Sequence, residues 1–543
     1  MTGAQTTSLG PDEIFVNAAG AITMRGRPTL DRELTAIAVR DGKLLALGSD
    51  ESIRAMVVGA KTTDLAGAVV MPGLIDSHCH FLNTGIGWER VQLSGSTSID
   101  ELLVRIAERV EQTPPGEWVL CSSRWHETNL TESRLPTAKE LDRVSPNHPI
   151  YLPRGGHVVV TNSLGLRLAG VAHDTRDPEG GEFVRDASGQ LTGMLLERPA
   201  FIRLTRLLPQ PDDEQRKRAL QSAMRSFNAA GITAIREPGL FAPEWAAYKE
   251  TFLQERSLRA SIMWRVDLVS SSEERRAWLA ALEPRIGEGD EWLDVWGIKV
   301  SVDGGVEGGY FREPYANNTD FVGYPLTTQE HLEMIVDQAG DLGWPVGVHV
   351  VGDAAMDMAL SAFERSRARK PFANHRHMLE HAFLPSERDF DRTGTMGVGV
   401  TLQHALVYAL GGNMRTYWGS DRAEDCSPAR AWLDSGVTVG IGTDSPVTDF
   451  DPWLNVYGFV TRDTQVAGVL GPQHGISVAE ALAGYTVGSA AVLRQSDMLG
   501  SLEAGKHADF ICLDRDPLSA PVDQVRDMKV LRTFVGGRSV YSA

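Results

Sequence analysis

VVMPGLIDSHCHF, from Val69 to Phe81, is the stretch that decides the fold of this chain. It opens with branched apolar residues, passes a Pro-Gly pair and ends in two histidines, His78 and His80. A short apolar run of this kind predicts a buried strand. Residues two apart on a strand point to the same side, so both imidazoles can reach one metal ion. Taken alone, a His-x-His pair fits chance as well as a metal site.

The segments after this stretch predict a barrel. Helical patterns lie between apolar strands, for example in residues 214–231 and 328–343, and each of these two ends in a glycine suited to a C-cap. Strands that alternate with helices predict a parallel sheet, and eight strands make a TIM barrel. The alternative, an open doubly wound sheet, lacks its glycine-rich phosphate loop at the first βα turn. The seven further strand segments begin at Gly231, Ser257, Val295, Pro345, Arg376, Gly397 and Val437.

Polar residues fall at the carboxyl ends of five of these strands, which is where a TIM barrel places its active site. Imidazole and carboxylate ligands suit Zn, Mn, Fe, Co or Ni, and they do not distinguish among these metals. Asp444 is the natural general base beside such a metal. The predicted metal ligands are His78 and His80 after the first strand, Lys299 in the fourth, His349 in the fifth, His381 in the sixth and Asp444 in the eighth.

Lys299 lies between Ile298 and Val300 in an apolar segment. A buried lysine must lose its charge, form an ion pair or react. If its neutral amine reacts with carbon dioxide, the resulting carbamate can bridge two metal ions about 3.5–4 Å apart. The alternative is a lysine paired with Asp303 or Glu307 at a mononuclear site.

PGLIDSHCHF, residues 72–81, resembles the first barrel strand of the amidohydrolase superfamily. With residues 153–171, 189–197 and 500–514, nearly the whole chain is similar to its amidohydrolase-3 branch of N-substituted formamide deformylase-like metal-dependent hydrolases. The resemblance implies two metal ions, expected to be Zn. His78, His80 and Asp444 would surround one ion, His349 and His381 the other, and a carboxylated Lys299 would bridge them.

The two ends of the chain are rich in β structure, including a hairpin predicted at Asp41-Gly42. The resemblance implies that residues 1–70 and 499–543 combine into one small β-sandwich beside a barrel of residues 71–498. Residues 82–215 form a long insertion, expected to cover the barrel mouth and shape the substrate pocket. Its tryptophans, and the lack of a basic cluster within it, favour an aromatic or apolar substrate. Its candidate substrate-binding residues are Trp88, Arg154, His157 and Asn162, with a structural role as the alternative for the last three.

Composition excludes several classes of protein. The 543 residues include 53 Lys and Arg against 71 Asp and Glu, so the net charge is −18. That balance argues against binding to nucleic acid or an anionic membrane. Four scattered cysteines give neither a disulfide framework nor a cysteine zinc cluster. No signal peptide or membrane helix is apparent, which predicts a cytoplasmic protein, and a homodimer is expected by analogy alone.

These patterns predict a metal-dependent hydrolase that acts on a non-peptide C–N bond through a metal-activated water. The expected substrate is a small amide, an N-acyl or N-formyl amine, or a cyclic amide. One alternative is a mononuclear deaminase of a ring or amidine carbon. A remote alternative is a non-catalytic scaffold barrel, which would be expected to have lost some of the metal ligands.

Overall fold

The computed structural model describes residues 11–56, 59–266, 271–283, 285–371 and 377–543. The prediction that the N-terminus carries no signal peptide falls mostly on residues 1–10, outside this part of the chain. Asp267 and Arg376, at the ends of two predicted strands, also lie outside it. Among the described residues, no helix combines the length and the apolar composition needed to cross a membrane.

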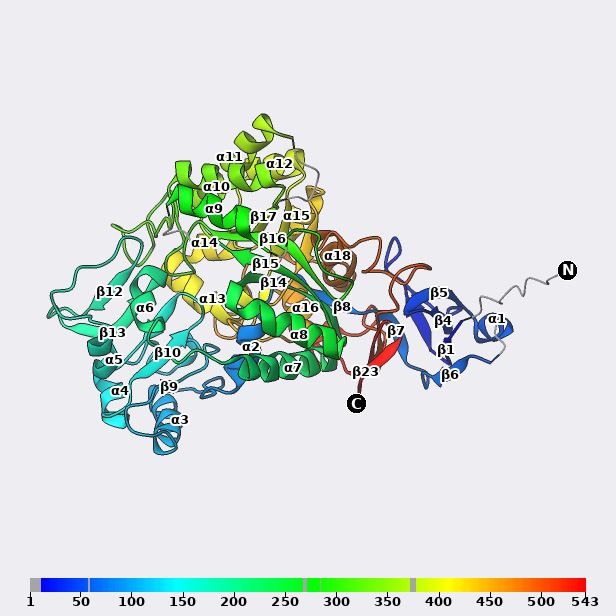
Figure 1. The fold of residues 1–543 in the computed structure, drawn as a ribbon, viewed down its shortest axis with the longest axis horizontal. Coiled ribbons are helices and arrows are strands. Elements are labelled where there is room, and N and C mark those ends of the chain that lie inside the picture. Colours follow the sequence, from blue (N-terminus) through cyan, green and yellow to red (C-terminus); the bar gives the residue numbers. More distant parts are fainter. Residues whose placement is uncertain (1–10, 57–58, 267–270, 284, 372–376) are drawn as a thin grey trace.

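Eight parallel strands form the central sheet, which confirms the predicted barrel (Figure 1). Neighbouring strands pair in chain order, from the first strand to the last. The first and last strands of this order also approach each other. There the Ser77 amide donates a hydrogen bond to the Ile441 carbonyl at 3.0 Å. The strands are β8 (Leu74–Asp76), β14 (Ile232–Leu240), β15 (Arg259–Arg265), β16 (Leu293–Ser301), β17 (Val346–Val350), β18 (Met378–His381), β19 (Gly399–Leu402) and β20 (Val439–Ile441).

Helices cover the outside of the barrel and share its apolar core, to which the strands contribute residues such as Val348 and the helices residues such as Phe363. The predicted C-cap of the second helical pattern is confirmed: the helix stops at Gly343, whose φ is 86°. These helices are α7 (Asp213–Ala229), α8 (Trp245–Glu255), α9 (Ser272–Ala281), α10 (Gln329–Leu342), α11 (Asp353–Arg369), α12 (Glu387–Met396), α13 (His404–Trp418), α15 (Ala429–Asp434), α16 (Pro452–Thr461), α17 (Val478–Ala483) and α18 (Ser489–Val492).

The opening stretch is two strands and not the single strand that was predicted. β7 (Val69–Pro72) pairs with strands from the chain ends, whereas β8 starts the barrel. Gly73 separates them, and a Cβ there would lie 2.2 Å from the Thr233 hydroxyl oxygen, so only glycine fits this close approach. His78 and His80 follow β8, in the connection to α2 (Phe81–Trp88), and are not strand residues.

The chain ends form two further sheets, which lie together at one side of the barrel (Figure 1). Phe15 packs edge-on against Phe510 and Phe534, with ring centroids 5.0 Å apart in both pairs, so residues from both chain ends share one core. The predicted hairpin joins β4 to β5. The sheets are β5 (Lys43–Gly48), β4 (Ala36–Arg40), β1 (Glu13–Val16) and β6 (Lys61–Asp64), then β23 (Arg538–Ser542), β22 (Val530–Val535), β21 (Phe510–Leu513), β7, β2 (Gly20–Ile22) and β3 (Leu30–Asp31).

The insertion between the first two barrel strands carries a five-stranded sheet of its own (Figure 1). Two apolar clusters hold it together, one of which contains Trp125 and the other Phe183. Its strands, in sheet order, are β12 (Glu182–Arg185), β13 (Leu191–Leu196), β11 (Val158–Val160), β10 (Ile150–Arg154) and β9 (Val119–Leu120), and its helices are α3 (Ile99–Glu111), α4 (Ala138–Val144), α5 (Ser163–Leu168) and α6 (Glu197–Thr205).

Candidate active site

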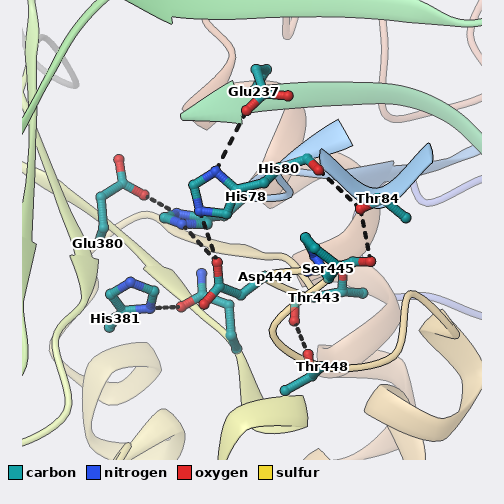
Figure 2. Close-up of polar contacts among 12 residues, drawn as sticks. His78, His80, Thr84, Glu237, Glu380, His381, Thr443, Asp444, Ser445 and Thr448 are labelled. Carbon is teal, nitrogen blue, oxygen red and sulfur yellow. Dashed lines mark hydrogen bonds and ion pairs between the residues drawn. The ribbon is translucent and has the colours of Figure 1, made fainter. Parts of the chain in front are cut away.

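The predicted ligands converge at one end of the barrel. Nε2 of His78 and Nε2 of His80 each lie 3.4 Å from Oδ1 of Asp444 (Figure 2). The His381 ring lies 4.8 Å from that of His78 and 4.6 Å from that of His349, measured between centroids. The resemblance implies that His381 shares one ion with His349. The His381 ring lies about as close to His78 as to His349, so it is not placed with His349 alone.

Two atoms at the centre of this cluster lack ordinary partners. His78 Nε2 and Asp444 Oδ1 are buried and make no hydrogen bond to the described residues. Ligand atoms of His78, His381 and Asp444 lie within 4.8 Å of one another. Burial alone would raise the pKa of Asp444, but His78 and His80 hold it well below its usual range. An ionised carboxylate beside unpaired imidazole nitrogens fits a divalent transition metal.

Buried side chains orient these imidazoles through the nitrogen that faces away from the cluster. Nδ1 of His78 lies 2.7 Å from Glu380, and Nδ1 of His381 lies 2.7 Å from Gln403. Nδ1 of His80 lies 3.5 Å from Glu237. Such partners fix the tautomer and the direction of a ligating histidine. None of these three partners was predicted from the sequence, although Glu380 and Glu237 stand out as acidic residues within apolar strands.

His349 is arranged differently from the other three histidines. Its Nε2 lies 3.2 Å from the carbonyl oxygen of Gly304, which leaves Nδ1 as the nitrogen for a metal. Burial lowers the pKa of His349 well below its usual range. The ring is therefore neutral at physiological pH, as a metal ligand must be.

Lys299 is buried, and among the described residues none forms a hydrogen bond or an ion pair with its amine. The alternative partners are engaged elsewhere: Asp303 accepts hydrogen bonds from backbone amides such as that of Gly352, and Glu307 binds Arg154. Burial lowers the pKa of Lys299 to about 8. Roughly a tenth of the amine is then neutral at pH 7 and can react with carbon dioxide.

A cavity of about 840 Å³ lies beside this cluster, and His80, Lys299 and Ser445 form part of its wall. The rest of the wall comes largely from the insertion and from the loops that follow the strands. The aromatic residues among these are Trp88, Tyr151, Phe201, Phe241 and Trp278.

Two of the four candidate substrate-binding residues, Trp88 and His157, line this cavity, whereas Arg154 and Asn162 do not. Arg154 is buried between Glu127 and Glu307, at 2.9 and 2.8 Å. The Asn162 side chain caps α5 and donates to buried carbonyl groups. Both side chains therefore serve the structure of the insertion, since their polar groups are fully engaged within it or against the barrel.

The sequence of the insertion was interpreted as lacking a basic cluster, but the folded insertion brings several arginines to one cavity. Four arginines of the insertion reach the cavity wall, two of them from α6 and its C-cap, and no continuous run of basic residues marks them in the sequence. These are Arg90, Arg124, Arg198 and Arg206.

An eight-stranded parallel barrel with histidine, lysine and aspartate side chains gathered at its strand ends defines the class of metal-dependent barrel hydrolases. The model of the amidohydrolase family matches residues 61–541, and the chain belongs to that family. It is accordingly a hydrolase that acts on carbon–nitrogen bonds.

Relatives of the chain are similar over most of their length. The chain is 29% identical to Protein LONG AFTER FAR-RED 3 of Arabidopsis thaliana, over 93% of this chain and 88% of that protein. It is 28% identical to an N-substituted formamide deformylase of Arthrobacter pascens, over 92% and 94%. The crystal structure of an uncharacterized metal-dependent hydrolase from Pyrococcus furiosus superimposes with a TM-score of 0.70 at 25% identity, covering 93% of this chain and all of that one.

Proposed function

We propose that this protein hydrolyses the C–N bond of a small amide, an N-acyl or N-formyl amine, or a cyclic amide. The observation that carries the proposal is the pair of buried atoms His78 Nε2 and Asp444 Oδ1, which lie 3.4 Å apart beside the cavity and make no hydrogen bond to the described residues. The similarity to an N-substituted formamide deformylase supports an N-formyl amine among these substrates. The proposed metal ligands are His78, His80, Lys299, His349, His381 and Asp444.

A divalent metal held by these residues would polarise the substrate carbonyl and lower the pKa of water. Asp444 stays ionised because its pKa is held low, so its carboxylate would be able to accept a proton from water and return it to the leaving nitrogen. His78, His80 and His381 keep their ligating nitrogens turned inward, because Glu380, Glu237 and Gln403 bind the opposite nitrogens. The aromatic and apolar side chains of the cavity wall would orient the amide.

We further propose two zinc ions bridged by a carboxylated Lys299. Its amine has no partner among the described side chains, and its lowered pKa supplies the neutral form that reacts with carbon dioxide. A carbamate would give this buried position the negative charge that two cations require. His381, which lies between His78 and His349, can then serve whichever ion lies nearer.

The metal content per chain tests this proposal. Wild-type protein purified without chelator is compared by elemental analysis with Lys299→Ala and with a matched control, Lys249→Ala, whose side chain is exposed on α8. Two metals in the wild type and in the control, falling to one or none in Lys299→Ala, are expected. One metal in all three would favour a mononuclear deaminase, for which His78, His381 and Asp444 would suffice.

Hydrolysis is measured on the same proteins with a panel of N-formyl and N-acyl amines, by detecting the released amine. Lys299→Ala is expected to lose activity and Lys249→Ala to keep it. Absence of metal from folded wild-type protein, together with absence of amine release, would revive the scaffold alternative.

A further inference from the structure

The cavity wall carries a charge opposite to that of the whole chain. The chain has a net charge of −18, yet a single carboxylate, Glu197, lines the described part of the cavity. That carboxylate is engaged, because it lies 2.8 Å from Nδ1 of His157 and accepts a hydrogen bond from the Gly305 amide. The arginines in the wall, whose charge does not depend on the state of Lys299, are Arg90, Arg124, Arg198, Arg206 and Arg265.

Arg265 stands out among these cations. It is the last residue of β15, and in the barrel register it pairs with Lys299 of β16. Its side chain is partly buried, and among the described residues none makes a hydrogen bond or an ion pair with the guanidinium. Burial and the neighbouring Arg198 lower the pKa of Arg265 to about 10, so the group keeps its charge at neutral pH. A partly buried cation without a partner in the fold offers its hydrogen-bond donors to a group bound in the cavity.

Three buried arginines elsewhere in the chain are paired with carboxylates, whereas a fourth, Arg462, is held by backbone carbonyl groups such as that of Cys426. Arg154 binds Glu127 and Glu307, and Arg236 binds Glu380 at 2.6 Å. Arg259, at the start of the strand that Arg265 ends, binds Asp509 at 2.7 Å. The fold supplies a carboxylate to each of these three and carbonyl groups to Arg462, whereas the described residues supply neither to Arg265, whose partner therefore comes from the cavity.

We infer that Arg265 binds a carboxylate of the substrate, so that the preferred substrates are amides that carry an anionic group away from the scissile bond. This inference rests on the proposed hydrolase function and adds the substrate class. A guanidinium binds a carboxylate through two parallel hydrogen bonds, which fixes orientation as well as charge.

The surroundings of Arg265 fit such a substrate. Trp278 and Phe241 line the same cavity, so an apolar or aromatic spacer can lie between the amide and the anion. Arg198 lies over the Phe241 ring at 5.8 Å and adds positive charge on the Arg265 side. Arg124 is already paired with Asp449 at 3.1 Å and is a weaker candidate for the contact.

The register with Lys299 offers one other role for Arg265, which is to support a carbamate on that lysine. The two roles differ in what is lost when the guanidinium is removed. Support of a carbamate predicts loss of metal and equal loss of activity on all substrates. Binding of a substrate carboxylate predicts full metal content and a loss confined to anionic substrates.

Two substrates with the same scissile bond separate these roles: 4-(formamidomethyl)benzoate and the neutral N-(4-methylbenzyl)formamide. The metal-loaded wild type is compared with Arg265→Met, Arg265→Lys and a control, Arg388→Met, whose side chain is 70% exposed on α12. We expect the wild type to prefer the anionic substrate through a lower KM. Arg265→Met should lose about 10- to 100-fold in kcat/KM on that substrate, mostly in KM, with little change on the neutral one. Arg265→Lys should recover part of the loss, and Arg388→Met should match the wild type.

Equal losses on both substrates, loss of metal in Arg265→Met, or no preference in the wild type would each overturn the inference. Binding supplies a readout that does not depend on turnover, namely quenching of tryptophan fluorescence by 4-methylbenzoate or by 4-methylbenzamide. If neither formamide is hydrolysed, nor any amide of the panel described above, the proposed function fails. Even then, the binding measurement tests the carboxylate site. If the wild type binds 4-methylbenzoate more tightly than 4-methylbenzamide and Arg265→Met does not, the site is supported. Equal binding of the two probes by the wild type overturns it.

Discussion

Nδ1 of His78 lies 2.7 Å from Oε2 of Glu380, and both side chains are buried. Glu380 also accepts hydrogen bonds from Arg236 at 2.6 Å and from Thr401 at 2.6 Å. Burial alone would raise the pKa of Glu380, but Arg236 holds it well below its usual range. The ionised carboxylate therefore fixes Nδ1 of His78 as a proton donor and leaves Nε2 directed at Asp444.

Replacing Glu380 with Gln removes the anion that Arg236 needs. Because a buried charge without its partner is strongly destabilising, Glu380→Gln is expected to lower the free energy of unfolding by about 3–5 kcal/mol. Thr401→Val is the matched control, since it removes one neutral donor and is expected to cost about 1 kcal/mol. Urea unfolding of metal-free protein measures both. Similar values for the two variants would mean that the Arg236–Glu380 pair contributes no more than an ordinary hydrogen bond.

Glu237 should act on metal affinity, since it lies 3.5 Å from Nδ1 of His80. Glu237→Gln weakens the hold on the His80 ring, and a loss of 10- to 100-fold in metal affinity is expected, roughly as for other partners of ligating histidines. Tyr248→Phe removes the hydroxyl that donates to the other Glu237 oxygen at 2.7 Å, and should have a smaller effect. Competition with a chromogenic chelator gives both affinities. An unchanged affinity in Glu237→Gln would show that the orientation of His80 does not depend on this contact.

The eight barrel strands could be predicted because each combines a short apolar run with a neighbouring helical pattern. The division at Gly73 could not, since a Pro-Gly pair inside an apolar run fits one bent strand as well as two strands. At Gly73 the Thr233 hydroxyl leaves no room for a side chain. That contact joins residues 160 positions apart, which no local pattern encodes.

The candidate ligands could be predicted for a similar reason, because strand ends of a barrel meet at one face. The residues around them could not. Glu237 and Glu380 are single acidic residues in apolar strands, and no spacing rule distinguishes a partner of histidine from a structural ion pair. The arginines of the cavity come from distant segments, so only the fold assembles them.

Arg154 should matter for stability and not for substrate binding. It is 3% exposed and joins Glu127 of the insertion to Glu307 of the loop after β16. Arg154→Met leaves both carboxylates buried without a cation, so a loss of about 3–5 kcal/mol is expected. Arg124→Met removes a more exposed pair with Asp449 and should cost less than about 1 kcal/mol. Unfolding in urea gives the free energies, and a raised KM in Arg154→Met with unchanged stability would instead support a substrate contact.

Glu244 should make stability depend on pH. Its side chain is partly buried at the start of α8 and accepts a hydrogen bond from the Phe241 amide at 2.8 Å. Burial raises the pKa of Glu244 to about 7, above the ordinary value of 4.5. The native state therefore holds this proton more tightly than the unfolded chain does. The free energy of unfolding therefore falls as the pH rises from the Glu244 pKa of the unfolded chain through that of the native state. The loss of stability is complete above about pH 7.

Glu244→Gln cannot ionise and keeps an oxygen for the Phe241 amide. The variant should match the wild type near pH 4.5 and exceed it at pH 8 by about 1 kcal/mol. This is less than the full shift would give at 1.36 kcal/mol per unit, because the side chain is partly exposed and solvent screens its charge. Urea unfolding of metal-free protein at the two pH values measures the difference, with Glu313→Gln, at an exposed position, as the control. A variant that is equally or less stable at pH 8 would show that the carboxylate is solvated in the native state, and that its burial has no cost.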